Sequence, residues 1–194
     1  MPVENGEAPG PLDEPTCVLE TKTMTKHLLL LALLAGVVGC DRVTKHVATE
    51  TLAGSPTQSL WFDVVRLSYA ENTGSFLSLG ANLPEPVRFT LFVVGSGALL
   101  VLLVVYALRA HWAGLKLVAL GLFVAGGASN LADRVMSGYV VDFLNVGVGP
   151  IRTGIFNVAD IAISAAIVLL IVGEYRQGRS PQHHTWRRMR GGKS

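Results

Sequence analysis

The sequence predicts a mainly α-helical membrane protein with four transmembrane helices, a small extracytoplasmic β-sheet and both termini in the cytoplasm. Half of its 194 residues are hydrophobic and only 15% are charged, with a mean hydropathy of +0.45. This composition is too apolar for an ordinary soluble domain. The four spans are apolar runs at about 27–47, 87–108, 115–133 and 155–175, each close to the ~20 residues that cross a bilayer as a helix.

Basic residues flank these runs unequally, and this predicts the orientation. Lys22 and Lys26 precede the first run, and Arg109 and Lys116 bracket the short connection between the second and third runs. Cytoplasmic connections carry an excess of Lys and Arg. With four spans, both termini then lie in the cytoplasm, and the ends of the spans that carry Asp lie at the outer face. The net charge of +2 gives no indication of nucleic-acid binding.

The chain divides into three segments by composition. Residues 1–24 are rich in Pro, Gly and acidic residues and lack an apolar pattern, so we expect a disordered extension. Met24 is an alternative start to Met1. Residues 25–176 form the four-span domain, and residues 177–194 form a basic cytoplasmic tail.

The two outer connections contain strand-like segments. Residues 61–69 alternate well enough for a short strand or hairpin, and residues 139–144 form a second strand-like run. Asn72–Gly74 and Pro84–Pro86 are predicted turns. We therefore expect a small sheet lying on the membrane surface.

The pattern Asn-x-x-Asp occurs twice at the edge of an apolar run, as Asn130–Asp133 and Asn157–Asp160. Carboxylates at membrane depth are rare and mark functional sites. Two that meet can divide the work of peptide hydrolysis, because one is ionised and takes a proton from water while the other is protonated and polarises the carbonyl. We predict that Asp133 and Asp160 are this catalytic pair. The alternative is structural: Asp160 favours a helix start, and Asp133 pairs with Arg134.

Further polar residues are candidates for a role around the same site. Asp41 and Lys45 have the spacing of a helical ion pair, either at the site or as a solvated surface pair. Arg134 either clamps a substrate oxygen or extends to the membrane interface. Asn72 and Gly74 offer hydrogen bonds and close backbone approach to a peptide, or form only a turn.

Small residues at 126–129 either pack helices closely or leave room for a substrate chain. The five histidines lack metal-ligand spacing, so we predict no metal site and no cofactor. Cys40 follows an apolar run, as in a lipoprotein signal, but cleavage there would remove the first span. We therefore expect Cys40 to be a small buried helical residue.

Five motifs in this order resemble the lipoprotein signal peptidase (signal peptidase II) family, over about residues 25–176. They are Asp41-Arg-Val-Thr-Lys45, Tyr69-Ala-Glu-Asn72-Thr-Gly74, Gly126-Gly-Ala-Ser-Asn130-Leu-Ala-Asp133-Arg134, Val140-Val-Asp142-Phe143 and Phe156-Asn157-Val-Ala159-Asp160.

The resemblance implies a multi-pass aspartic endopeptidase of the bacterial inner membrane with its active site at the periplasmic face. Its partners would be membrane lipids and prolipoproteins, which it would cut before a cysteine carrying diacylglycerol, and we expect a monomer. Asp133 and Asp160 match the catalytic pair, each Asn supporting its own Asp. The positions that match substrate-binding or supporting residues are Asp41, Lys45, Asn72, Gly74, Gly126, Asn130, Arg134, Asn157 and Ala159.

Two positions depart from the family pattern. Ser129 stands where the family usually has Gly, and Ser75-Phe76-Leu77 replaces a small-small-aromatic step. They leave open a divergent paralogue with restricted substrates. Two further functions stay open at this point: a small transporter or proton-relay subunit, and a non-catalytic homologue that shields lipidated substrates.

Overall fold

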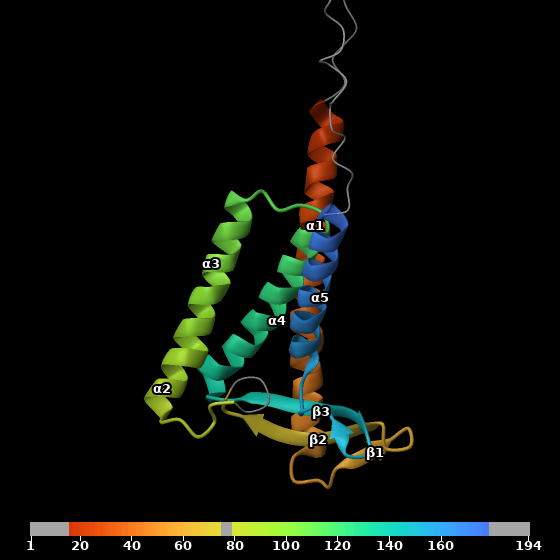
Figure 1. Cartoon of the computed structure of the whole chain (residues 1–194), viewed down its shortest axis with the longest axis vertical. Coiled ribbons are helices and arrows are strands. Elements are labelled where there is room, and N and C mark those ends of the chain that lie inside the picture. Colours follow the sequence, from red (N-terminus) through yellow and green to blue (C-terminus); the bar gives the residue numbers. More distant parts are fainter. Residues whose placement is uncertain (1–15, 75–78, 179–194) are drawn as a thin grey trace, which may run out of the picture.

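The computed structural model describes residues 16–74 and 79–178. Three further helical segments lie beside the long helix α1, and a small sheet lies across one end of all four (Figure 1). The predicted extension up to residue 15, the tail after Gly178 and the Ser75-Phe76-Leu77 departure lie outside the described residues.

The helices largely follow the predicted spans. They are α1 (Thr16–Leu52), α2 (Glu85–Phe89), η2 (Thr90–Gly95), α3 (Ser96–Arg109), α4 (Leu115–Ser137) and α5 (Val158–Gly178). Helix α1 begins inside the predicted disordered extension, because the segment from Thr16 lacks Pro and Gly and contains good helix formers. Pro84–Pro86 forms a helix start and not only a turn, since Pro84 is the N-cap of α2.

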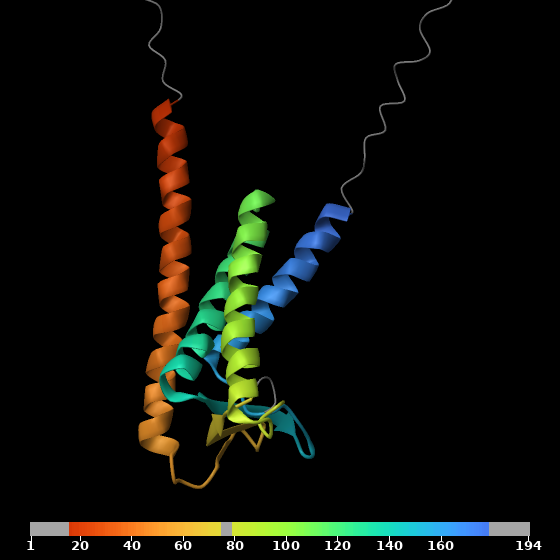
Figure 2. The same ribbon diagram turned by 90° about the vertical axis from the view of Figure 1, so that its left-hand side faces the viewer.

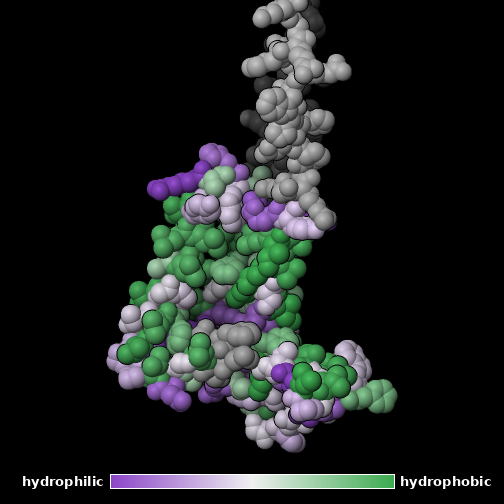
Figure 3. Space-filling model, in the orientation of Figure 1, coloured by the Kyte–Doolittle hydropathy of each residue, from purple (hydrophilic) through white to green (hydrophobic). Residues whose placement is uncertain are grey.

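Three helices among the described residues are long and apolar enough to cross a membrane. They are Glu85–Arg109, which joins α2, η2 and α3, then Leu115–Ser137 and Val158–Arg176. Hydrophobic residues cover most of the helical part of the face shown in Figure 3. Cys40 lies on α1 and is exposed, so the expectation that it is buried was wrong.

The sheet has four antiparallel strands in the order β1-β2-β3-β4. They are β1 (Gln58–Leu60), β2 (Val65–Asn72), β3 (Val140–Val148) and β4 (Ile151–Arg152). The strand-like run at 139–144 is confirmed, and the run at 61–69 belongs to a hairpin in which residues 61–64 are the turn and the strand begins at Val65. Phe143 of β3 packs against Ala48 and Leu52 at the end of α1, and these three form the buried apolar core at this end of the helices.

Short connections fix the sheet to the helices. Gly138 ends α4 in the left-handed region with φ of 81°, its N–H donates to the Arg134 carbonyl at 3.1 Å, and β3 begins two residues later. Phe156 exchanges backbone hydrogen bonds with Leu144. Because Phe156 is held in this bridge, α5 begins at Val158 and not at the predicted residue 155.

Helices α4 and α5 pack closely at Gly126 and are also in contact at the end far from the sheet, where Lys116 and Glu174 form an ion pair. Figure 2 shows that α5 is inclined relative to α1. A Cβ at Gly126 would collide with the Ala159 carbonyl oxygen and would lie 2.9 Å from Ile163 Cγ1. Gly127 also packs closely, since a Cβ there would lie 2.8 Å from Leu100 Cδ2, and it lines the cavity described below. Close helix packing is therefore confirmed, and room for a substrate chain stays a prediction.

Gly126→Ala is expected to destabilise the protein, because the added methyl meets backbone that cannot rotate away. We expect a loss of about 1–3 kcal/mol, the usual cost of overpacking, measured by thermal unfolding in detergent. Gly36→Ala on α1 is the control, since nothing lies within 4 Å of its Cβ position. Equal melting temperatures for the two variants would contradict the close packing.

Candidate active site

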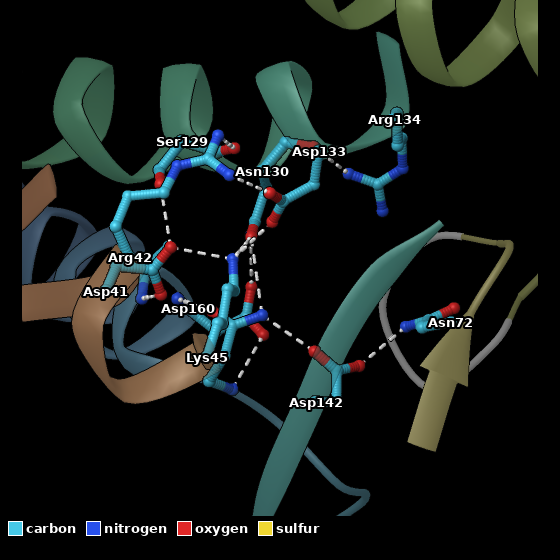
Figure 4. A network of polar contacts seen from close by, with 12 residues as sticks. Asp41, Arg42, Lys45, Asn72, Ser129, Asn130, Asp133, Arg134, Asp142 and Asp160 are labelled. Carbon is cyan, nitrogen blue, oxygen red and sulfur yellow. Dashed lines mark hydrogen bonds and ion pairs between the residues drawn. The ribbon is translucent and has the colours of Figure 1, made fainter. Parts of the chain in front are cut away.

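A polar network lies where α1, α4, α5 and β3 meet above the sheet (Figure 4). Its members are Asp41, Arg42 and Lys45 from α1, Ser129, Asn130 and Asp133 from α4, Asp142 from β3, and Asn157 and Asp160 at the start of α5. Helix α1 is far from the other three elements in the sequence. The network therefore exists only in the folded chain.

Lys45 is the cationic centre of this network and is only 5% exposed. Its Nζ lies 2.7 Å from Asp41 Oδ2 and 2.7 Å from Asp133 Oδ2, and it donates to Asn130 Oδ1 at 2.8 Å. The predicted Asp41–Lys45 pair is confirmed, and it is buried instead of solvated. Removing one partner of a buried ion pair strongly destabilises the folded protein, because it leaves a buried charge without compensation.

Asp41 is fully buried and ties α1 to the start of α5. Its Oδ1 accepts the backbone N–H of Ala159 at 2.8 Å, where α5 begins, and a carboxylate is favoured there by the free N–H groups and the helix dipole. Its Oδ2 accepts the Ser129 hydroxyl at 2.7 Å. Ser129, which departs from the family pattern, thus adds a hydrogen bond that Gly lacks.

The start of α5 is a reciprocal cap. The Asp160 N–H donates to Asn157 Oδ1 at 3.0 Å, and the Asn157 N–H donates to Asp160 Oδ2 at 3.2 Å. The structural alternative for Asp160, favouring a helix start, is therefore also present. Asn157 additionally donates through Nδ2 to Asp142 Oδ1 at 2.6 Å, so the capping residue holds two carboxylates.

Asn130 links the two Asn-x-x-Asp segments. Its Nδ2 donates to Asp160 Oδ1 at 2.8 Å, and its Oδ1 accepts from Lys45 at 2.8 Å and from Asn157 at 3.3 Å. The expectation that each Asn supports its own Asp is wrong for the Asn130 side chain, because that amide reaches the Asp of the other motif. Asp133, three residues further along α4, points towards α1 instead and accepts a hydrogen bond from Lys45.

Asp133 is held by two cations of α1. Arg42 Nη1 donates to its Oδ1, and Lys45 donates to its Oδ2 at 2.7 Å. The suggested pairing with Arg134 does not occur, because Arg134 donates to the Gly74 carbonyl at 2.7 Å and the Asn130 carbonyl at 3.3 Å.

A cavity of about 600 Å³ opens beside this network. Apolar side chains of α3, α4 and α5 line most of it, and polar side chains gather at its sheet end. Those polar residues are Asn72, Asn130, Arg134, Asp142 and Asp160. Asp133 is not among the residues that line it. The two carboxyl groups that face the cavity together are thus Asp142 and Asp160.

Asp142, Arg42 and Ser129 belong to the network but were not predicted as site residues, and of these three only Asp142 lines the cavity. Asp142 is 3% exposed and accepts hydrogen bonds from Asn157 at 2.6 Å and from Asn72 Nδ2 at 2.9 Å. Burial raises its pKa to about 6; the hydrogen bond from Asn72 opposes this rise, and the charge of Asp160 adds to it. The signal was present, since Asp142 stands in the Val-Val-Asp-Phe motif and on a predicted strand.

Arg134 lines the cavity and is hydrogen-bonded to Gly74, two residues after the end of β2. The Gly74 N–H donates to Asn72 Oδ1 at 3.0 Å, which confirms the predicted turn. Within the described residues, Nε of the half-buried Arg134 has no hydrogen-bond partner. This donor beside the cavity is available to an oxygen of a bound molecule. In residues 16–74 and 79–178, no group of three His, Cys, Asp or Glu side chains is arranged to hold a metal ion.

Comparison with known proteins identifies relatives of this chain. The family model of signal peptidase (SPase) II matches residues 33–176. Similar relatives include the lipoprotein signal peptidase of Sphingopyxis alaskensis, 35% identical over 68% of this chain and 76% of its own length, and that of Rhodococcus jostii, 33% identical over 82% of this chain and 80% of its own.

The fold is also similar to solved structures. One bacterial membrane enzyme aligns with a TM-score of 0.68 at 23% identity, over 80% of this chain and 92% of that one. A second aligns with a TM-score of 0.64 at 25% identity, over 75% and 92% of the two chains. The fold, the five motifs in order and the match over residues 33–176 agree. The chain belongs to the signal peptidase II family.

Proposed function

We propose that this protein is an aspartic endopeptidase of the bacterial inner membrane that removes signal peptides from diacylglyceryl-modified prolipoproteins, with Asp142 and Asp160 as the catalytic pair. Its family supports the peptidase activity on prolipoproteins. The observation that carries the choice of pair is that Asp142 and Asp160 both line the apolar cavity, whereas Asp133 does not.

The bonds to Asp133 and Asp142 support a division of roles. Both oxygens of Asp133 are engaged by cations, and paired cations keep a carboxylate ionised and held in place. We therefore propose that Asp133 positions Lys45 and Arg42. The raised pKa of Asp142 favours the neutral acid, as a residue that polarises a carbonyl requires.

The proposed reaction is general acid/base catalysis without a covalent intermediate. Asp160 takes a proton from water, and the resulting hydroxide adds to the carbonyl carbon before the lipidated cysteine. Protonated Asp142 donates a hydrogen bond to the carbonyl oxygen. When the C–N bond breaks, the proton taken from water passes to the amine of the cysteine. Arg134 Nε, at the same end of the cavity, would bind a substrate oxygen.

We also propose that α1 is the fourth membrane-spanning helix and that the sheet lies at the outer face. Most of the predicted span 27–47 is apolar and lies within α1, which runs beside the other three helical segments (Figure 1). Arg109 and Lys116 stand at the end of the helices far from the sheet, as the rule for cytoplasmic connections requires. The chain is proposed to act as a monomer.

One assay tests this function. Purified protein is incubated with a diacylglyceryl-modified prolipoprotein, and the products are identified by mass spectrometry. The expected product begins with the lipidated cysteine. Prolipoprotein without the lipid is the control substrate. Binding of the lipidated substrate without cleavage would instead indicate a non-catalytic homologue, and proton flux in liposomes without cleavage would indicate a transporter.

The activity is expected to depend on the protonation of Asp142. Its raised pKa means that the neutral acid is present below about pH 6 and is lost above it. The alkaline limb of kcat/KM should therefore be centred near that pH. Asn72→Ala removes a hydrogen bond that lowers this pKa, so the limb should move to higher pH. A limb that stays in place in this variant would contradict the role of Asp142.

A further inference from the structure

The sheet ends in two turns that expose apolar side chains. In the β1–β2 turn Trp61 is 76% exposed and Phe62 is fully exposed, and in the β3–β4 turn Val148 is 71% and Ile151 82% exposed. We call these four residues the apolar tip. This end of the sheet projects sideways beyond α1 and α5 (Figure 1), and hydrophobic side chains gather on the same lobe (Figure 3).

The two turns form one surface, because the strand register brings them to the same end of the sheet. Val65, which follows the first turn, pairs with Val146, which precedes the second. The Gly147 N–H donates to the Val64 carbonyl at 2.9 Å, and Arg152 Nη1 donates to the Asp63 carbonyl at 2.7 Å. The apolar tip is thus a single patch held by bonds between the turns.

The first turn is built in an unfavourable conformation that keeps its aromatic residues outside. Trp61, Phe62 and Asp63 have φ of 48°, 55° and 69°, in the left-handed region that disfavours side chains other than glycine. Polar contacts of Asp63 compensate: its carboxylate lies 2.6 Å from Arg66 Nη2 and accepts the Ser59 hydroxyl at 2.7 Å. Aromatic side chains that only filled the core of the sheet would not need a turn that holds them in solvent-exposed positions.

The position of the sheet indicates what covers the patch. Helix α4 ends at Ser137 and β3 begins at Val140, while α5 begins at Val158. Both helices are long and apolar enough to cross a membrane, so the sheet cannot lie far from the bilayer surface. Trp and other amphipathic aromatic side chains prefer that boundary between lipid and water.

We propose that the apolar tip inserts into the interfacial layer of the bilayer leaflet in which α4 ends and α5 begins, and so anchors the projecting end of the sheet on the membrane. The anchor acts on the site at a distance, because β3 carries both Val148 at the tip and Asp142 at the cavity. It fixes the depth of that strand relative to the lipid. The proposal rests on the membrane character of the chain and not on its peptidase activity.

The test is the depth of Trp61 in lipid. The full chain with Trp112→Phe and Trp186→Phe, which leaves Trp61 as the one tryptophan, is reconstituted in phosphatidylcholine vesicles with brominated acyl chains. We expect loss of most Trp61 fluorescence when bromine lies near the headgroup and a smaller loss when it lies near the chain ends. Quenching by aqueous acrylamide with no effect of bromine would overturn the anchor. So would shielding from both quenchers together with cross-linking of two chains, which would identify a second copy as the partner.

A matched pair of variants tests the patch in the same background. Phe62→Ser should shift Trp61 emission to longer wavelength and weaken quenching by bromine. Gln58→Ser, at an exposed polar position of the neighbouring strand, should change neither. Equal quenching in both variants would remove Phe62 from the anchor, and the parent protein still reports the depth of Trp61 if Phe62→Ser does not fold.

Discussion

Replacing Asp142 or Asp160 with Asn is expected to lower the rate of prolipoprotein cleavage by about 10²–10⁴-fold, the usual contribution of a general acid or base. Each substitution keeps the shape of the side chain but removes the proton exchange that the reaction needs. The loss should appear in kcat, because the cavity that binds the substrate is retained. The measurement is single-turnover cleavage of a lipidated prolipoprotein by the purified variants.

Two further variants make this experiment specific. Glu71→Gln removes an exposed carboxylate of the same sheet and should leave the rate unchanged. Asp133→Asn is expected to keep more activity than either dyad variant, because it removes a partner of Lys45 and Arg42 and not a group of the cavity. An inactive but folded Asp133→Asn protein beside an active Asp142→Asn protein would restore the pair predicted from the sequence.

Lys45→Met is expected to destabilise the fold by about 3–5 kcal/mol, as when one partner of a buried ion pair is removed. It leaves Asp41 and Asp133 without their shared cation in a site where Asp41 is fully buried. Unfolding by heat in detergent measures the change. Replacing both acids as well, by Asp41→Asn and Asp133→Asn, removes the unpaired charges and should recover part of the loss.

Lys116→Met is the matched control for this prediction. Lys116 also forms an ion pair, 2.6 Å from Glu174, but the Glu174 side chain is 67% exposed. Pairs that face solvent contribute about 0–1 kcal/mol. If the two Lys variants lose the same stability, the energetic importance of burial at Lys45 is refuted.

The spans and strands could be predicted from the sequence because they depend on local patterns. An apolar run of helical length predicts a helix, and an alternating segment predicts a strand, whatever the rest of the chain contains. The exact ends could not, since they depend on contacts across the fold. The bridge between Phe156 and Leu144 holds the chain extended up to the reciprocal cap of α5, and no local pattern contains that bridge.

The candidate site was only half predictable for the same reason. The spacing predicted that Asn130 and Asp133 share a helix face. In the structure, however, the Asp133 side chain points towards α1 and the Asn130 side chain towards α5. The repeated Asn-x-x-Asp pattern also stands out in the sequence more clearly than Asp142, which lies on a strand. Only the register of β3 beside the start of α5 brings Asp142 to the amide of Asn157.

The bonds of Asn130 have a consequence for how substitutions combine. Its amide can donate to Asp160 only while its oxygen points at Lys45 and Asn157. Loss of Lys45 removes the strongest constraint on that orientation, and a rotated amide would turn an acceptor towards Asp160. Lys45 and Asp160 are therefore thermodynamically coupled without touching, and a double-mutant cycle should show an interaction energy of about 0.5–3 kcal/mol.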